Sequence, residues 1–149
     1  MKRSPLPIGL VTGASRGLGA HLARQIADLG YGVVLHHRGG TLATNRLSRQ
    51  IAAFGTPTLV VRADLSQPAQ VTRMFQQIRR KFGRLDLLIN NAGTYQPTSL
   101  LSTRPEAWFA GIHSTATATF LTTQAALPLF TKNGGHIVNL GDSAADRLT

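Results

Sequence analysis

The sequence predicts one α/β domain built on a doubly wound parallel sheet. Short apolar runs alternate with segments in which apolar residues recur every three or four positions, and glycines stand at many of the junctions. Because parallel strands are joined through right-handed crossover helices, this alternation favours helices on both faces of the sheet. The 149 residues, of which 42% are hydrophobic, suffice for a single packed domain, which we expect to span residues 1–149.

The first half of the chain contains three strand–helix units. The expected strands and helices follow each other at residues 8–12, 18–29, 32–36, 42–54, 58–61 and 68–82. The last of these helices has the clearest pattern, because Val71, Met74, Phe75 and Ile78 form one apolar stripe and Gly83 follows its end.

The second half adds a fourth unit and a fifth strand. The near-continuous apolar run at residues 85–89 is typical of a strand that is buried on both faces. Thr103 and Glu106 have the spacing of a capping box, so a long helix is expected from there to about residue 130. The residues along one side of this helix are Ile112, Ala116 and Phe120. After two glycines, the fifth strand is expected at residues 137–140.

The composition narrows the classes of protein to consider. The chain has no cysteine, which excludes disulfides and cysteine-bound zinc, and we expect no metal site. No segment approaches about 20 uninterrupted apolar residues, so we expect a soluble, cytoplasmic protein without a membrane span. The formal net charge is +10, but the arginines are spread over predicted helix faces. This spread favours attraction of a polyanionic ligand over nucleic-acid binding. Nucleic-acid binding stays as an alternative, and it predicts an affinity that falls steeply as the salt concentration rises.

A glycine loop, TGASRGLG at residues 12–19, connects the first strand to the first helix. Gly13 allows a tight turn, Gly17 allows the backbone to approach a pyrophosphate, and Gly19 allows the helix to pack close to the sheet. The amino end of the helix offers free N–H groups to phosphates. The motif predicts a dinucleotide site, with contacts from Gly13, Ser15, Arg16, Gly17, Leu18 and Gly19.

The tract HHRGG at residues 36–40 ends the second strand, where a carboxylate would select NAD by binding the ribose 2′-hydroxyl. No carboxylate is present there. Arg38 and the histidines His36 and His37 stand in its place, with Arg16 in the glycine loop. Guanidinium groups pair well with a 2′-phosphate, so NADP(H) is the expected cofactor. The alternative is that Arg38 is only a solvated turn residue.

Four motifs together resemble the short-chain dehydrogenase/reductases. They are TGASRGLG, Asp64-Leu65, NNAG at residues 90–93 and HIVNLGDS at residues 136–143. The resemblance implies a Rossmann-type sheet and an NADPH-dependent reductase that transfers hydride to a C=O or C=N bond of a small-molecule substrate. It also implies a homo-oligomer for the full-length protein. The cofactor contacts that it adds are Asp64, Leu65, Asn91, Ala92 and Gly93.

Within that family, the details are similar to the pteridine reductases. The HHR tract is similar to theirs, and Tyr95 in NAGTYQPTSL would stack on a pterin. Asp142 stands where most members of the family have a catalytic serine and where the pteridine reductases have an aspartate. Neighbouring strand residues face opposite sides, so Asp142 and Ser143 are alternatives for the inward group, and the alignment favours Asp142.

Two departures from the family pattern bear on catalysis. Thr115 stands where the family has an asparagine that supports a water-linked proton relay, and a threonine could replace it only in part. The family's Tyr-x-x-x-Lys is absent, because neither Tyr31 nor Tyr95 has a lysine four residues later. We therefore expect a sheet truncated after its fifth strand and a chain that is inactive alone. The alternative is a non-catalytic nucleotide-binding fragment or pseudoenzyme, and the substrate and oligomeric state stay open.

Overall fold

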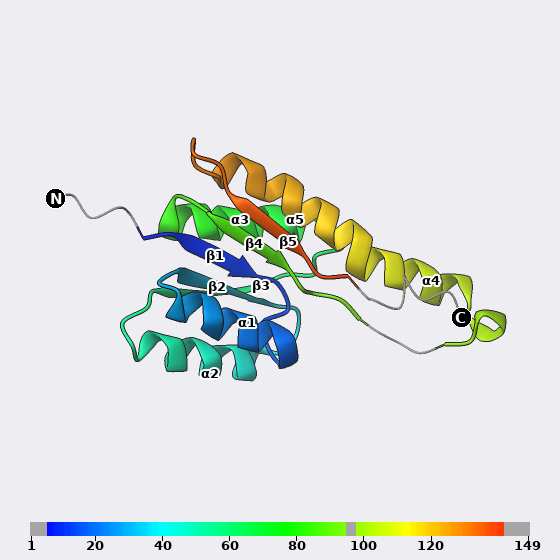
Figure 1. The fold of residues 1–149 in the computed structure, drawn as a ribbon. Helices are drawn as coiled ribbons and strands as arrows, with labels where there is room; N and C mark the ends of the chain where they lie inside the picture. Colours follow the sequence, from blue (N-terminus) through cyan, green and yellow to red (C-terminus); the bar gives the residue numbers. More distant parts are fainter. Residues whose placement is uncertain (1–5, 95–97, 142–149) are drawn as a thin grey trace.

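The computed structural model describes residues 6–94 and 98–141 and shows five parallel strands in one sheet, with the order β3-β2-β1-β4-β5 (Figure 1). The strands are β1 (Ile8–Val11), β2 (Gly32–His37), β3 (Thr58–Arg62), β4 (Leu87–Asn90) and β5 (His136–Asn139). The predicted Rossmann-type α/β class is confirmed. After β3 the chain crosses to the other side of β1, so the switch point, where such folds bind ligands, lies between β1 and β4.

Helices cover both faces of the sheet, as Figure 1 shows for α1 and α2 on one side and α3 and α5 on the other. The α-helices are α1 (Gly17–Asp28), α2 (Thr41–Ala52), α3 (Pro68–Phe82), α4 (Pro105–Ile112) and α5 (Ala118–Ala126). Alternate strand residues serve two separate cores, since Leu10 and Val34 pack toward α3 and α5, whereas Val11 and Leu35 pack toward α1 and α2.

Helix α3 shows how the sequence fixes an element. Pro68 occupies its first turn, where the missing N–H costs nothing, and Gly83 ends it in a left-handed conformation with φ 71°. The predicted stripe of Val71, Met74 and Ile78 is buried against the sheet. Burying each such side chain contributes about 1.5–3 kcal/mol.

The long helix expected up to residue 130 is interrupted. A π-helical segment, His113–Thr117, separates α4 from α5, and a 3₁₀ turn, Leu127–Leu129, follows α5. The expected capping box is wrong, because Arg104 is the N-cap and makes no side-chain cap bond. Thr103 instead donates from Oγ1 to the carbonyl of Ser99 at 2.8 Å, which turns this hydroxyl away from the start of α4.

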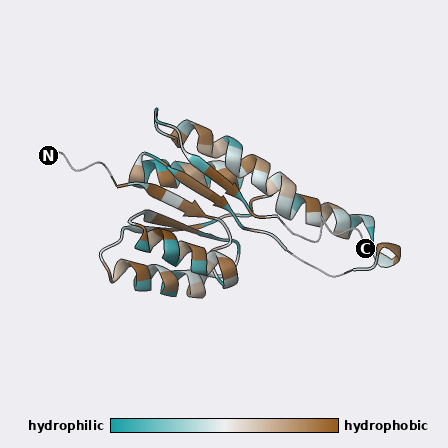
Figure 2. Cartoon of the chain, in the orientation of Figure 1, coloured by the Kyte–Doolittle hydropathy of each residue, from teal (hydrophilic) through white to brown (hydrophobic). Residues whose placement is uncertain are grey.

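The apolar side of α4 and α5 points away from the core, and Figure 2 shows hydrophobic residues along both helices. Ile112 and Phe120 are 38% and 61% exposed, while Ala118, Thr122 and Ala126 form the buried side of α5. The three-to-four-residue spacing identified a helix here but not its buried face. Exposed apolar surface of this kind favours association between molecules.

We expect the 149-residue polypeptide to self-associate as its concentration rises. The double variant Ile112→Gln, Phe120→Gln should shift the protein toward the monomer, because it removes exposed apolar surface without touching the core. Light scattering coupled to size-exclusion chromatography measures the mass. A wild-type mass that stays monomeric over the concentration range would contradict this expectation.

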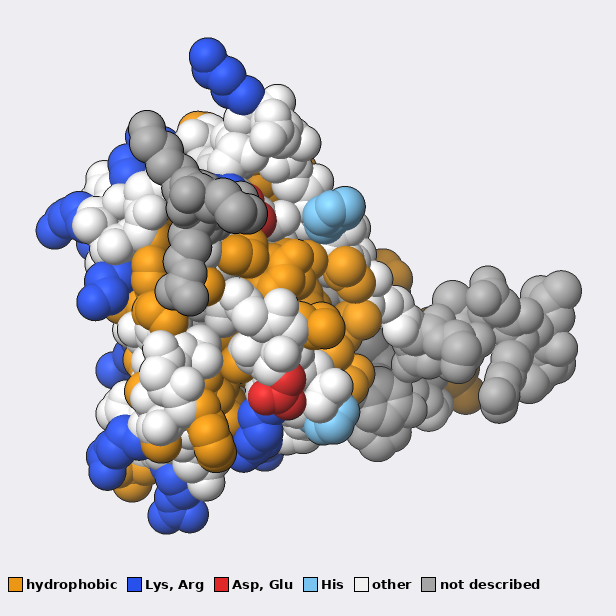
Figure 3. All heavy atoms as spheres, turned by 60° about the vertical axis from the view of Figure 1, so that its left-hand side comes forward, with side chains coloured by type: hydrophobic (Ala, Val, Ile, Leu, Met, Phe, Trp, Pro, Cys, Tyr) orange, Lys and Arg blue, Asp and Glu red, His pale blue; other side chains and the backbone are white. Residues whose placement is uncertain are grey.

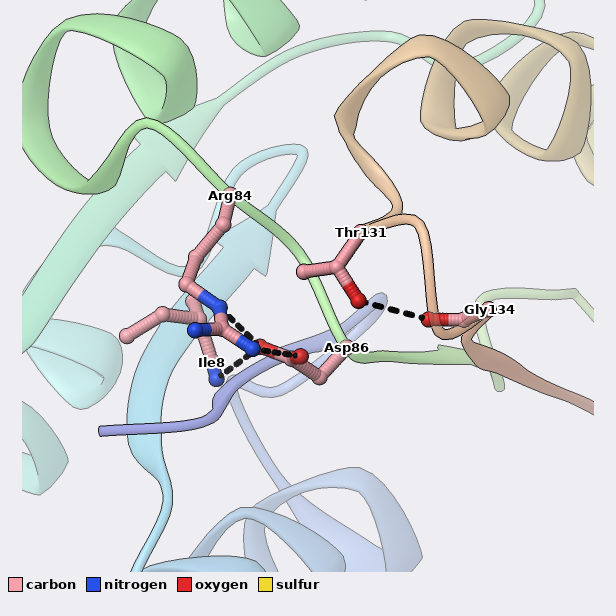
Figure 4. A network of polar contacts seen from close by, with 5 residues as sticks. All are labelled: Ile8, Arg84, Asp86, Thr131 and Gly134. Carbon is pink, nitrogen blue, oxygen red and sulfur yellow. Dashed lines mark hydrogen bonds and ion pairs between the residues drawn. The ribbon is translucent and has the colours of Figure 1, made fainter. Parts of the chain in front are cut away.

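Polar contacts hold the amino ends of the strands together (Figure 4). The Asp86 carboxylate accepts from the backbone N–H of Ile8 at 2.8 Å and from Arg84 Nε at 2.9 Å. The Asp86 backbone also donates to the Ile8 carbonyl and accepts from His136 N–H, each at 2.8 Å. One residue therefore links β1, β4 and β5.

Figure 3, which brings the left-hand side of Figure 1 forward, shows Lys and Arg gathered mainly along one margin of that view.

Replacing Asp86 by Ala should lower the free energy of unfolding by about 1–3 kcal/mol, because it leaves the Ile8 N–H and the Arg84 guanidinium without their acceptor. Urea denaturation at pH 7 measures the change. Glu106→Ala is the matched control, since Glu106 pairs with Arg104 at 3.5 Å on an exposed surface and should change stability by only a few tenths of a kcal/mol. Equal losses in both variants would refute the role of Asp86.

Candidate nucleotide-binding site

A cavity of about 650 Å³ opens at the carboxyl ends of β1, β2 and β4. This volume lies within the range of cofactor sites. The structure brings these predicted cofactor residues to its wall: Gly13, Ser15, Arg16, Gly17, Leu18, Gly19, Arg38, Asp64, Leu65, Asn91, Ala92 and Gly93. It adds residues that were not predicted as cofactor contacts: His36, Gly39, Gly40, Ala43, Ala63, Ser66, Thr94, Ser114 and Ala118.

The glycine loop forms a cradle that side chains would fill. A Cβ on Gly19 would lie 2.3 Å from the Gly13 carbonyl oxygen and 2.5 Å from Asn91 Nδ2, so only glycine allows α1 to start this close to the sheet. Gly17 has φ 55° and nothing within 4 Å of its Cβ position, which leaves open space beside the backbone. Helix α1 begins at Gly17 with no acidic residue in its first turn and no side-chain cap. Its free N–H groups and dipole fit a phosphate.

Thr12 and Asn91 fasten the end of β4 to the glycine loop. Thr12 Oγ1 accepts from the N–H groups of Asn91 and Ala92, both at 2.9 Å. Asn91 Nδ2 donates back to the Thr12 carbonyl at 2.8 Å. These bonds fix the two backbones that form the middle of the cavity wall. Thr12 was missed as a supporting residue, although a hydroxyl at the end of a buried apolar strand is a signal of such a role.

His36 joins the glycine loop to the end of β3. It is 2% exposed, and its Nδ1 accepts from the Gly13 N–H at 3.1 Å. Since Nδ1 is an acceptor, Nε2 carries the proton and donates to the Ala63 carbonyl at 3.0 Å. Burial lowers the pKa of His36 to about 4, so the ring is neutral near pH 7. A protonated ring would lose the bond to Gly13.

His37 was expected to contact the cofactor, but the structure places it outside the cavity. Adjacent residues of β2 face opposite sides of the sheet, so His36 reaches the cavity and His37 points the other way. Within the described part of the chain, His37 Nδ1 is buried and has no hydrogen-bond partner. Burial and the nearby Arg62 lower the pKa of His37, which favours its neutral form.

The turn after β2 carries Arg38, one of the arginines that line the cavity. Arg62 Nε donates to the Arg38 carbonyl at 3.1 Å and so braces this turn. A Cβ on Gly40 would lie 2.5 Å from the Cβ of Ser15, so the turn packs directly on the glycine loop.

The carboxylate of Asp64 accepts from Ser66 N–H at 3.0 Å and from Ser66 Oγ at 2.7 Å. The Ser66 hydroxyl, aided by the positive Arg38, lowers the pKa of Asp64, which is therefore ionised.

The opposite end of the cavity carries hydroxyl groups. Thr94 and Ser114 line it, but Thr115, the expected relay residue, does not. Thr115 is exposed, and its Oγ1 donates to the Gly111 carbonyl at 2.8 Å. The expected Tyr95 and Asp142, with its alternative Ser143, lie outside the described residues.

Neither metal-ligand clusters nor membrane spans are found in residues 6–94 and 98–141. No group of three or more His, Asp or Glu side chains in these ranges has a geometry that could hold a metal ion. Over the same ranges, the helices are too short or too polar to cross a bilayer.

Comparison with known proteins places the chain in a family. A family model described as short chain dehydrogenase matches residues 8–147, and the chain belongs to this family. A 3-oxoacyl-[acyl-carrier-protein] reductase from Synechocystis sp. is 35% identical over 134 residues, covering 89% of this chain and 54% of the relative. The corresponding reductase from Staphylococcus aureus is 32% identical over 132 residues, covering 88% and 54%. The chain thus spans about half the length of the curated relatives it matches.

A solved structure shows the same fold. The short chain dehydrogenase from Burkholderia cenocepacia J2315, crystallised in complex with NADP, superposes with a TM-score of 0.91 at 29% sequence identity. The match covers 99% of this chain and 60% of that one. The family resemblance inferred from the four sequence motifs is therefore confirmed at the level of family and fold.

The buried His36 predicts a pH-dependent stability. Its pKa is about 4 when folded and 6.5 when unfolded, so between these values the unfolded chain binds more protons. The stabilising contribution is complete above pH 6.5 and falls by about 3 kcal/mol as the pH drops toward 4. His36→Asn should flatten the dependence of unfolding free energy on pH in this window, measured by urea denaturation. Equal slopes in wild type and His36→Asn would contradict the assignment.

Proposed function

We propose that this chain binds NADP(H) and provides the cofactor domain of an NADPH-dependent reductase. The observation that carries the proposal is the cavity itself, which combines a glycine cradle at the start of α1 with an arginine-bearing turn after β2. Among the described residues that line this cavity, Asp64 is the only acid, and it lies after β3 rather than at the end of β2. The position that would select NAD through a ribose hydroxyl therefore has no carboxylate.

Each part of NADPH has a suitable group in the cavity wall. The N–H groups at the start of α1 would hold the pyrophosphate, and Arg38 with Arg16 would pair with the 2′-phosphate. The ionised Asp64 would accept from the adenine amino group. Bound NADPH would supply a hydride from its nicotinamide ring. Asn91, Ala92 and Gly93 would form the wall beside the second nucleoside.

For the substrate we propose a C=O compound. The curated relatives with 35% and 32% identity are reductases of 3-oxoacyl groups, which supports a carbonyl as the hydride acceptor. A pterin is the second candidate, supported by the HHR tract, Tyr95 and Asp142. A carboxyl group such as Asp142 donates a proton only when its pKa is raised, and a basic pterin nitrogen suits it better than a ketone does.

We further propose that the 149-residue polypeptide binds cofactor without turning over a substrate. In the family pattern a tyrosine donates the proton while a lysine four residues later lowers its pKa. Neither tyrosine in this sequence has a lysine at that spacing. Cofactor binding without NADPH oxidation in the presence of ketone or pterin substrates would support this proposal, and substrate-dependent NADPH oxidation would refute it.

Arg38→Asp should reverse the preference between the two nicotinamide cofactors. Wild type should bind NADPH about 10- to 100-fold more tightly than NADH, because a charge-assisted pair with the 2′-phosphate is worth about 1.5–3 kcal/mol. The introduced carboxylate would repel that phosphate and could bind the free hydroxyl of NADH. Fluorescence titration with each cofactor measures both dissociation constants.

Arg46→Asp is the control for Arg38→Asp. It makes the same change in charge on the exposed side of α2, away from the residues that line the cavity, so the preference should persist. Equal affinities of the wild type for NADPH and NADH would mean that Arg38 is only a solvated turn residue.

A further inference from the structure

Two hydroxyl groups meet at the end of the cavity opposite Arg38. Thr94 follows the NNAG motif after β4, and Ser114 lies in the π-helical segment between α4 and α5. Thr94 Oγ1 and Ser114 Oγ are 2.8 Å apart, and both residues line the cavity. The contact joins two segments that lie 20 residues apart in the chain.

The direction of the hydrogen bonds within this pair can be worked out. Ser114 Oγ donates to the Gly111 carbonyl at 3.1 Å, and a hydroxyl has a single proton to donate. Thr94 Oγ1 must then donate to Ser114 Oγ, which leaves the lone pairs of the Thr94 oxygen available to accept from a ligand. In this state the pair presents an acceptor at the cavity wall.

The same pair can also present a donor. If Ser114 turned its proton to Thr94, Thr94 could donate to a ligand, and Gly111 would lose one of its two donors. Its carbonyl would still accept from Thr115 Oγ1 at 2.8 Å, so the reversal leaves no unsatisfied backbone group. The pair therefore suits a ligand group that both donates and accepts, such as a sugar hydroxyl.

The position of the pair along the sheet indicates which part of the cofactor it faces. Arg38 follows β2 and Asp64 follows β3, while the glycine loop follows the central β1. A dinucleotide with its pyrophosphate on the glycine loop and its 2′-phosphate at Arg38 extends its second nucleoside across β4. Thr94 and Ser114 lie on that side of the cavity.

We propose that the Thr94–Ser114 hydroxyl pair binds the nicotinamide riboside half of NADPH, with Thr94 in contact and Ser114 as its positioning residue. This rests on the proposed function, because it assumes that the cavity holds NADPH. The ribose hydroxyls of that half donate and accept, as the pair does. Thr115, whose hydroxyl is exposed, has no direct part in this contact.

The test compares a ligand that has the nicotinamide riboside with one that lacks it. NADPH and 2′,5′-ADP are titrated by calorimetry into the 149-residue polypeptide and into its Thr94→Val and Ser114→Ala variants. Each variant should raise the Kd for NADPH about three- to tenfold, as expected for the loss of one hydrogen bond, and leave the Kd for 2′,5′-ADP unchanged. Thr94→Ser should restore NADPH affinity because it keeps the hydroxyl.

Ser48 and Thr58 provide a matched control. Their hydroxyls also form a pair, at 2.7 Å, but neither residue lines the cavity, so Ser48→Ala and Thr58→Val should leave both affinities unchanged. An equal loss of both ligands in the Thr94 and Ser114 variants, or no loss of either, would overturn the proposed contact and leave the proposed function standing. Failure of the wild type to bind either ligand would overturn the proposed function and this contact with it.

Discussion

The close approach of the glycine loop to the end of β4 is the constraint on which the site depends. A Cβ on Gly19 would collide with the Gly13 carbonyl and with the Asn91 amide, so any larger residue would move α1 away from the sheet. That displacement would move the free N–H groups of α1 away from the cavity. Thr12, at the start of the loop, accepts through Oγ1 from the backbone N–H groups of Asn91 and Ala92 after β4. His36, in β2, accepts through Nδ1 from the backbone N–H of Gly13 in the loop. The geometry of the proposed phosphate site is thus fixed by packing before any ligand enters.

The carboxyl end of β4 is also held by side chains of β5 and α5, which supply the rigidity behind that contact. Asn90, the last residue of β4, accepts from Thr122 Oγ1 at 2.7 Å and donates to Asn139 Oδ1 at 2.9 Å. These side chains connect β4, β5 and α5 through satisfied polar groups, which specify one arrangement where apolar contacts alone would allow sliding. With Asp86 at the amino ends, β4 is held at both of its termini, so the residues that follow Asn90 enter the cavity from a fixed position.

The elements that could be predicted from the sequence are those governed by local patterns. The strand and helix order, the stripe of α3 and the glycine loop follow from periodicity and from backbone conformations that favour glycine. The choice between His36 and His37 could not be made in this way. Every residue of β2 is buried, so its sequence shows no alternation between an apolar and a polar side, and only the register against the glycine loop decides which imidazole reaches the cavity. The exposure of the apolar side of α4 and α5 could not be predicted either, because its apolar residues have the spacing of a core-facing helix.

The π-helical segment explains why the hydroxyl end of the site differs from the expected one. A π turn holds more residues than an α turn, so it changes the direction of side chains relative to a continuous helix. The family alignment selects Thr115, while the structure presents Ser114 to the cavity and leaves Thr115 exposed. Both hydroxyls still share the Gly111 carbonyl, at 3.1 Å and 2.8 Å. A change at Thr115 would therefore reach the cavity through the Gly111 carbonyl and Ser114.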